Sequence, residues 1–324
     1  MNLRQKNKAI IRIAVLDSGL GGLSICAELE KGLQAHGLYQ KVSLLYFNIW
    51  PEQGRGYNSL GSMAERISVF DRALVSVSNF QPDLIMIACN TLSVIYDRTP
   101  FSRKTAIPVL DIVDFGVELI HANLKEMPDS QVLILGTRTT VAEKAHQQKL
   151  LHKGVDKHRI KGQACHGVAT EIEKDPQGTA VEKLIDAYMA EAARKLISGQ
   201  TVLAALCCTH FAYSSDIFKD KLLDRSSGEV VILNPNTEMS GFLFRNEPQH
   251  AFSSTEISIA VISKIDLVQA KIISMSNAVR PVSEKTANAL VNYCLLYTSP
   301  SPRDCGPDLV LRLLLEKGGG GGGG

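Results

Sequence analysis

Long hydrophobic runs and an excess of charge of one sign are both missing from this sequence of 324 residues. No apolar run reaches the ~18–20 residues that cross a membrane as a helix. The basic N-terminus leads into an acidic turn without a cleavage-like site, so we expect no signal peptide. The formal net charge is +2, and lysine and arginine form no stripe. This balance argues against nucleic acid or an anionic membrane as the main partner.

Cysteine is present, but not in the spacing of a disulfide framework or a common zinc site. The chain has seven cysteines, an odd number, and no Cys-x-x-Cys pair. We therefore expect free thiols in a reducing cytoplasm. A zinc site would have to be assembled from residues that lack the usual ligand spacing, namely Cys165, His166, Cys207, Cys208 and His210. We predict no metal.

Short apolar runs alternate with helix-like stretches along most of the chain. Strands are expected at residues 10–16, 42–47, 84–88, 131–135 and 201–206. Continuous apolar strands that alternate with helices are typical of a parallel sheet covered on both faces, which is the α/β class. Because the series restarts near Val132, we predict two similar α/β domains with the active site in the cleft between them.

The expected domains divide the chain at three points. We predict a first domain over residues 1–107, a second over 108–210 and a C-terminal part over 211–293 that packs back on the first domain. This part has a strand-like segment near 256–265 to which no role is assigned.

The last segment, residues 294–324, has an unusual composition. It contains LLYTSPSPRD, which looks like a translated sequencing adapter, and a glycine run that looks like a translated G homopolymer. We interpret the segment as a non-native tail joined to a truncated gene. The alternative is a genuine flexible tail rich in Ser, Pro and Gly.

Two of the expected strands end in nearly the same way. Residues 85–94 read IMIACNTLSV, and residues 202–211 read VLAALCCTHF. The carboxyl ends of parallel strands line the ligand cleft of an α/β fold. Polar residues follow two other strands at the same position: Asp17, Ser18, Thr137 and Thr140. The spacing therefore predicts one cleft that contains two thiols, Cys89 and Cys208.

Two thiols across one small ligand suit a particular reaction. A thiol reacts as the thiolate, and a helix N-terminus after a strand favours an anion. One cysteine can remove a proton from a carbon while the other delivers a proton to the opposite face, which inverts a stereocentre without a cofactor. Asn90, Thr91 and Thr209 add short donors for a carboxylate. The alternative is inert buried cysteine, which is how we interpret Cys26 and Cys207.

Three motifs in this order resemble those of the aspartate/glutamate racemase superfamily, and its glutamate racemase branch most closely. They are IAVLDSGLGGLS at 13–24, IACNT at 87–91 and CCTHF at 207–211, and the resemblance covers about residues 10–235. It implies an isomerase that needs no cofactor and interconverts L- and D-glutamate. It also implies a cytoplasmic enzyme, often a homodimer, that supplies D-glutamate for peptidoglycan.

The resemblance implies a role for each residue of these motifs. Cys89 and Cys208 would be the acid/base thiols, and Asp17 and His210 would assist proton transfer near them. Glu173, in ACHGVATEIE, matches a family acidic residue near the second thiol. The family's substrate contacts match Ser18, Asn90, Thr91 and Thr209, and two family threonines match Thr137 and Thr140.

Simpler interpretations exist for the assisting residues. Asp17 and Ser18 would cap the following helix. His210 would be a satisfied structural histidine, and Glu173 a solvated helix charge.

The loop after the second strand departs from the family pattern. Where the family has Pro-Tyr-Gly, counting from Tyr46 gives Gly54-Arg55-Gly56, and Ile49 replaces a nearby family Asp. Arg55 and Gly56 are the expected substrate contacts here, with Arg55 able to bind a distal carboxylate through two hydrogen bonds. The alternative is that Arg55 is an exposed loop charge. The motifs thus indicate two-thiol chemistry and leave the acidic amino acid open.

Three other functions remain open from the sequence. One is another superfamily enzyme, such as an aspartate or hydantoin racemase. A second is a catalytically silent protein with the racemase fold. The third is a nucleotide-binding module, because SGLGG follows the first strand, but Ser24 stands where G-x-G-x-x-G needs its third glycine.

Overall fold

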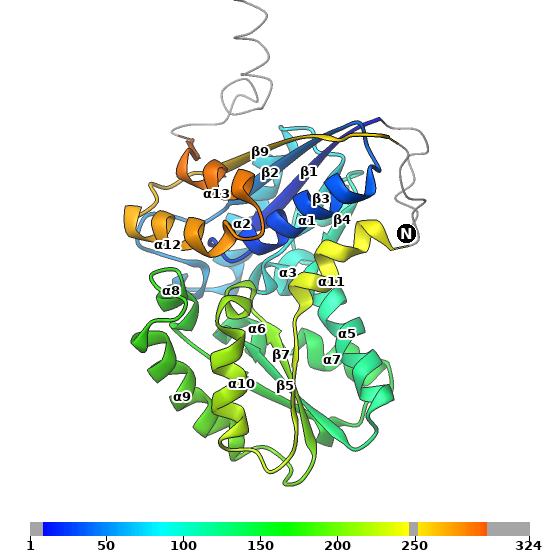
Figure 1. Ribbon diagram of the computed structural model, residues 1–324, viewed down its shortest axis with the longest axis vertical. Coiled ribbons are helices and arrows are strands. Elements are labelled where there is room, and N and C mark those ends of the chain that lie inside the picture. The colour runs from blue at the N-terminus through cyan, green and yellow to red at the C-terminus, as the bar shows by residue number, and fades with distance from the viewer. Residues whose placement is uncertain (1–8, 246–251, 297–324) are drawn as a thin grey trace, which may run out of the picture.

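The computed structural model describes residues 9–245 and 252–296, and two parallel sheets form its framework (Figure 1). The first sheet has the order β10-β9-β2-β1-β3-β4. Its strands are β1 (Ile10–Asp17), β2 (Lys41–Asn48), β3 (Leu84–Ile87), β4 (Val109–Asp111), β9 (Glu256–Ser263) and β10 (Cys294–Leu295). The second sheet, in the order β6-β5-β7-β8, has β5 (Ser130–Gly136), β6 (Ile160–Ala164), β7 (Thr201–Cys207) and β8 (Val230–Leu233). The predicted α/β class with two parallel sheets is confirmed.

Helices cover both faces of each sheet. Around the first sheet lie α1 (Leu23–His36), α2 (Met63–Ser78), α3 (Asn90–Tyr96), α4 (Pro100–Lys104), α12 (Gln269–Val279) and α13 (Glu284–Val291). The remaining helices are α5 (Ile112–Glu126), α6 (Arg138–Ala142), α7 (Ala145–His152), α8 (Val168–Ile172), α9 (Thr179–Ala193), α10 (Ser215–Leu223) and α11 (Pro235–Gly241). Figure 1 shows the two sheets in two lobes, with α11 where the lobes meet. None of the described helices is both long and apolar enough to span a bilayer.

The buried strands explain why the apolar runs are continuous. Along β1, Ile13 and Val15 face one hydrophobic core, while Ala14 and Leu16 face another on the opposite side of the sheet. Side chains alternate between faces along a strand, so both sets must be apolar when helices cover both faces. Full burial of each such aliphatic side chain contributes about 1.5–3 kcal/mol.

The chain is divided between the sheets differently from the predicted boundaries. The boundary at 107/108 falls before β4, which extends the first sheet by pairing with β3. Part of the predicted C-terminal segment, β8, belongs to the second sheet through β7, whereas β9 pairs with β2 of the first sheet. These pairings join residues far apart in the sequence, so local patterns do not reveal them.

The segment interpreted as a non-native tail begins inside the described part of the chain. Its first residues form β10, which pairs with β9. Residues 297–324, with most of the adapter-like string and the glycines, lie outside the described residues.

Strand register brings the polar residues to one edge of each sheet. In the first sheet Asp17 pairs with Asn48, and Asn48 with Ser263, while Ile87 pairs with Leu16. In the second sheet Gly136 pairs with Cys207. The residues that follow these rows therefore start level with one another at the carboxyl edges, where α/β proteins bind ligands.

Candidate active site

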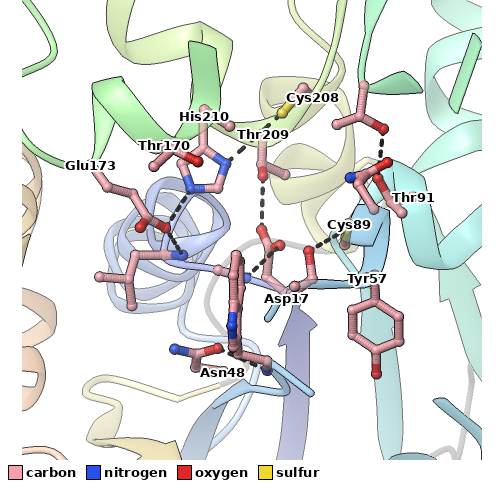
Figure 2. A pocket seen from close by; sticks show the side chains of 18 of the residues that line it. Asp17, Asn48, Tyr57, Cys89, Thr91, Thr170, Glu173, Cys208, Thr209 and His210 are labelled. Carbon is pink, nitrogen blue, oxygen red and sulfur yellow. Dashed lines mark hydrogen bonds and ion pairs between the residues drawn. The ribbon is translucent and has the colours of Figure 1, made fainter. Parts of the chain in front are cut away.

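A cavity of about 420 Å³ lies at the carboxyl edges of both sheets (Figure 2). Most of the predicted site residues line it: Asp17, Ser18, Gly56, Cys89, Asn90, Thr91, Thr137, Glu173, Cys208, Thr209 and His210. The structure thus brings together the ends of β1, β3, β5 and β7 from two sheets. Arg55 and Thr140 are not among the residues that line this cavity.

Cys89 lies between β3 and the first turn of α3 and faces a hydroxyl group. The Ser18 oxygen is 3.1 Å from its sulfur. Burial, and then the negative charge of Asp17, raise the pKa of Cys89 to about 12, although the Ser18 hydrogen bond acts in the opposite direction. Without a ligand this residue is therefore a neutral thiol at neutral pH.

Asp17 connects the first motif to the second domain. Its Oδ2 accepts hydrogen bonds from the Gly22 N–H at 2.7 Å and from the Thr209 hydroxyl at 2.7 Å, and its Oδ1 accepts one from the Gly19 N–H at 3.3 Å. The carboxylate holds the turn before α1 and joins this turn to the residue after Cys208, but it does not cap the helix, because the N-cap of α1 is Gly22 and has no side-chain cap hydrogen bond. Its predicted part in proton transfer stays a prediction.

Cys208 faces a network of charged side chains. Its sulfur is 3.9 Å from Nδ1 of His210, and Nε2 of His210 is 2.9 Å from Oε1 of Glu173. Oε1 also accepts a hydrogen bond from the Leu20 N–H at 3.0 Å, and Oε2 accepts one from Lys271 Nζ at 2.7 Å. Figure 2 shows His210 between Glu173 and Cys208 along one side of the cavity.

The opposite charges in this network stabilise one another. Burial alone would raise the pKa of Glu173, but His210 and Lys271 lower it to about 2. Burial would lower the pKa of His210, but its bonds to Cys208 and Glu173 raise it well above the usual range. His210 is therefore a cation beside Cys208 at neutral pH, and a cation in this position stabilises negative charge on sulfur. A buried and paired Glu173 is not the solvated charge of the alternative interpretation.

Threonine hydroxyls and an unpaired amide form a polar patch near Cys89. Oγ1 of Thr91 is 2.8 Å from that of Thr137, which is 3.0 Å from that of Thr140. Thr140 therefore supports Thr137 from behind instead of lining the cavity. Asn90 is buried, yet neither its amide nitrogen nor its oxygen has a partner in the structure. Buried polar groups are usually hydrogen-bonded, so Asn90 is poised for a ligand.

The loop after β2 takes a different path from the one that counting along the sequence predicts. Arg55 does not line the cavity and pairs with Glu52 at 3.0 Å and Glu65 at 3.4 Å. Gly56 does line the cavity, and the short 3₁₀ helix Tyr57–Ser59 continues the wall. Two nearby carboxylates thus hold the guanidinium of Arg55 on the surface, as the alternative of an exposed loop charge expects, and its substrate contact stays a prediction.

Several residues in the cavity wall had not been predicted. Trp50, the sole tryptophan of the chain, packs where a Cβ on Gly56 would come within 2.6 Å of its ring. Residues 265–268, between β9 and α12, and Lys271 of α12 also line the cavity. A lone tryptophan beside a glycine-rich loop was an available signal for Trp50, whereas no local pattern marks Lys271. Among the described residues, no group of three or more His, Cys, Asp or Glu is arranged to hold a metal.

Comparison with known proteins places this site in a family. The chain is 28% identical to the glutamate racemase of Campylobacter jejuni over 229 residues, which is 68% of this chain and 83% of the relative. Its fold resembles the crystal structure of Francisella tularensis glutamate racemase in complex with D-glutamate, with a TM-score of 0.64 and 23% identity over 83% of this chain and 94% of the other. It also resembles a Bacillus anthracis glutamate racemase, with a TM-score of 0.63 and 19% identity over 88% and 95% of the two chains.

The family itself is identified by its sequence profile. The profile described as Asp/Glu/Hydantoin racemase matches residues 15–233, more than half of the chain. This range contains Cys89, Cys208 and the His210–Glu173 pair that faces the second thiol. The chain therefore belongs to the Asp/Glu/Hydantoin racemase family.

Proposed function

We propose that this protein is a glutamate racemase, a cofactor-independent isomerase that interconverts L- and D-glutamate by proton transfer at the α-carbon. The observation that carries the proposal is the pair of thiols, Cys89 and Cys208, in one cavity at the strand ends of two domains. Relatives named glutamate racemase, and a similar structure that holds D-glutamate, favour glutamate as the substrate. The product D-glutamate would serve peptidoglycan synthesis in the cytoplasm, and a homodimer is expected.

The proton transfer uses one sulfur as base and the other as acid. The Cys208 thiolate removes the α-proton, so the C–H bond breaks and an S–H bond forms. The Cys89 thiol then donates its proton to the opposite face of the carbon, which leaves Cys89 as the thiolate. The opposite enantiomer reacts by the reverse sequence. His210 stabilises the negative charge at Cys208, and the Ser18 hydroxyl does so at Cys89.

The remaining lining residues would hold the amino acid in place. The unpaired amide of Asn90 and the hydroxyls of Thr91 and Thr209 offer donors and acceptors for the α-amino and α-carboxylate groups. The wall from Gly56 to Ser59 would face the distal part of the substrate. Holding the α-carbon between two sulfurs is an effect of orientation, which contributes a large part of the acceleration in such reactions.

Hydrogen–deuterium exchange tests the proposal directly. The protein is incubated in D2O with L- or D-glutamate and, separately, with each enantiomer of aspartate, and proton NMR follows the loss of the α-proton. Exchange with inversion of glutamate is expected. Cys89→Ala and Cys208→Ala should both stop inversion, because each leaves one thiol, and each should retain exchange with at most one enantiomer.

The other candidate functions predict different results. Exchange of aspartate alone would identify a different racemase of the same superfamily. A folded protein that exchanges no enantiomer of either amino acid would contradict the proposal and favour a silent racemase-fold protein.

A further inference from the structure

The network of charged side chains beside Cys208 extends to a residue of the C-terminal segment. Lys271, the third residue of α12, places Nζ 2.7 Å from Oε2 of Glu173. The other oxygen of Glu173 accepts hydrogen bonds from His210 and the Leu20 N–H. The side chain of Glu173 is 7% exposed and that of Lys271 is 23% exposed. The ion pair is therefore largely shielded from solvent, unlike the surface pairs that contribute little to stability.

The two partners of this ion pair come from different domains. Helix α12 is fixed to the first domain because Ile272, Met275 and Val279 pack in the core around β1. Glu173 follows α8 in the second domain and holds His210 of the same domain. Lys271 thus joins the first domain to the end of the network that leads through Glu173 and His210 to Cys208.

We propose that Lys271 is a positioning residue for the second thiol: it holds Glu173, so that Glu173 keeps the His210 imidazolium against the Cys208 sulfur. This inference deepens the proposed racemase function and assigns a role to the C-terminal segment. Lys271 does not react. It holds the second oxygen of a carboxylate whose other oxygen contacts His210 and the Leu20 N–H, and it adds a second cation to the network.

The charge balance shows the expected direction of the effect. Glu173 carries one negative charge between two cations, His210 and Lys271. These three side chains together therefore have a net positive charge next to Cys208. Other titratable groups among the described residues interact with this network or line the same cavity, namely Asp17, Tyr46, Cys165, His166, Cys207 and Asp266. Without Lys271 the Glu173–His210 pair would be neutral overall, and negative charge on the Cys208 sulfur would lose part of its stabilisation.

Alkylation of each cysteine tests this role without any assumption about the substrate. Iodoacetamide reacts with thiolates, and peptide mass spectrometry reports the rate at Cys208 and Cys89 separately across a pH series. Lys271→Gln should slow alkylation of Cys208 about tenfold at neutral pH. Its pH profile should move to higher pH, so that the two rates converge in alkali. Lys271→Arg should restore most of the rate.

A second lysine from the same segment provides the control. Lys285 of α13 lies 3.8 Å from Glu30, whose side chain is 8% exposed, and neither residue lines the cavity. Lys285→Gln should therefore keep the wild-type rate at Cys208. An unchanged profile in Lys271→Gln, an equal slowing at every pH, or an equal slowing at Cys89 would overturn the inference.

The racemase assay separates this inference from the proposed function. A shifted profile at Cys208 together with exchange of glutamate supports both. A shifted profile with no exchange of either amino acid keeps the role of Lys271 and rejects the proposed function. Exchange of glutamate with an unshifted profile keeps the proposed function and rejects the role of Lys271.

Discussion

The two thiols of the cavity have opposite electrostatic surroundings. Cys89, from the first domain, lies 3.1 Å from the Ser18 hydroxyl and near the Asp17 carboxylate, and its pKa is raised to about 12. Cys208, from the second domain, faces His210, whose pKa is raised well above the usual range by contact with Glu173 and Cys208. Two domains of similar architecture thus place an anion near one thiol and a cation near the other.

This difference indicates the state of the enzyme before substrate binds. The proton stays on Cys89, whose pKa burial raises to about 12, whereas the cation of His210 lies beside the Cys208 sulfur. Each inversion moves a proton from one sulfur to the other in effect, so the enzyme must also use the reverse state. The substrate's ammonium and carboxylates, together with Ser18, must therefore offset the bias while the amino acid is bound.

Removing the cation beside Cys208 should have the largest effect. His210→Asn keeps a polar side chain of similar reach but no charge, and we expect kcat for racemisation to fall about 10²–10³-fold. Polarimetry of D-glutamate formation measures this fall. His152→Asn is the matched control, because His152 is exposed and bonds only to its own helix at Gln148. Activity within a factor of about two of wild type in His210→Asn would mean that the charge of His210 does not distinguish Cys208 from Cys89 in catalysis.

Neutralising Glu173 should lower the stability of the fold, and the loss should depend on pH. A carboxylate whose folded pKa is lowered stabilises the fold above its unfolded pKa of about 4.3, and this contribution is lost as the pH falls toward the folded value of about 2. Glu173→Gln should therefore lower the free energy of unfolding by about 3 kcal/mol at pH 7. The difference from wild type should shrink below pH ~4. Urea unfolding at several pH values measures it, and a difference independent of pH would contradict the expectation.

A methyl group at Gly21 should disturb the junction between the domains without changing any charge. A Cβ there would lie 2.4 Å from Oγ1 of Thr209 and 2.5 Å from Nδ1 of His210. Gly21→Ala should shift the Cys208 side relative to Cys89 and lower kcat about 100-fold. Gly241→Ala is the control, because a Cβ at that helical glycine meets no atom within 4 Å. Similar activity in the two variants would show that the turn does not set the distance between the thiols.

The sequence predicted the reacting groups better than the residues around them. Continuous apolar runs marked β1, β3, β5 and β7, and polar residues at the ends of these strands are fixed in place by the strands themselves. Cys89 and Cys208 could therefore be placed in one cavity before the fold was known. Such local patterns suffice wherever a residue directly follows a buried strand.

The missed residues depend on contacts between distant parts of the chain. Strand β9 pairs Glu256 with Lys41 of β2, and this pairing brings Lys271 to the cavity. No periodicity within residues 252–296 indicates which strand β9 joins. The prediction for the loop after β2 depended on a count of residues: Gly54 has a φ of +76°, and Arg55, which follows this turn, pairs with Glu52 and Glu65 on the surface. A count of residues cannot show such a turn.

A smaller effect is expected from the hydroxyl beside Cys89. Ser18→Ala removes a hydrogen-bond partner of that sulfur, and kcat should fall about tenfold. The cost is smaller than at His210 because a neutral hydroxyl stabilises a thiolate less than a cation does. Ser93→Ala is the control, since the Ser93 hydroxyl, on α3, donates to the Ile87 carbonyl at the end of β3 and Ser93 does not line the cavity. A loss as large as that of His210→Asn would mean that the two sides are equivalent.

The smallest effect is expected at Arg55, and it tests whether the first domain really lacks a cation at the reacting carbon. The guanidinium pairs with Glu52 and Glu65 on the surface, so Arg55→Ala should leave KM and kcat for glutamate within about twofold of wild type. Gly56→Ala is the contrast, because its new Cβ would meet the Trp50 ring at 2.6 Å within the cavity wall. A tenfold rise in KM for Arg55→Ala would mean that the loop turns inward over the substrate. Arg55 would then offset the Asp17 charge near Cys89, and the opposition between the two thiols would hold only for the empty enzyme.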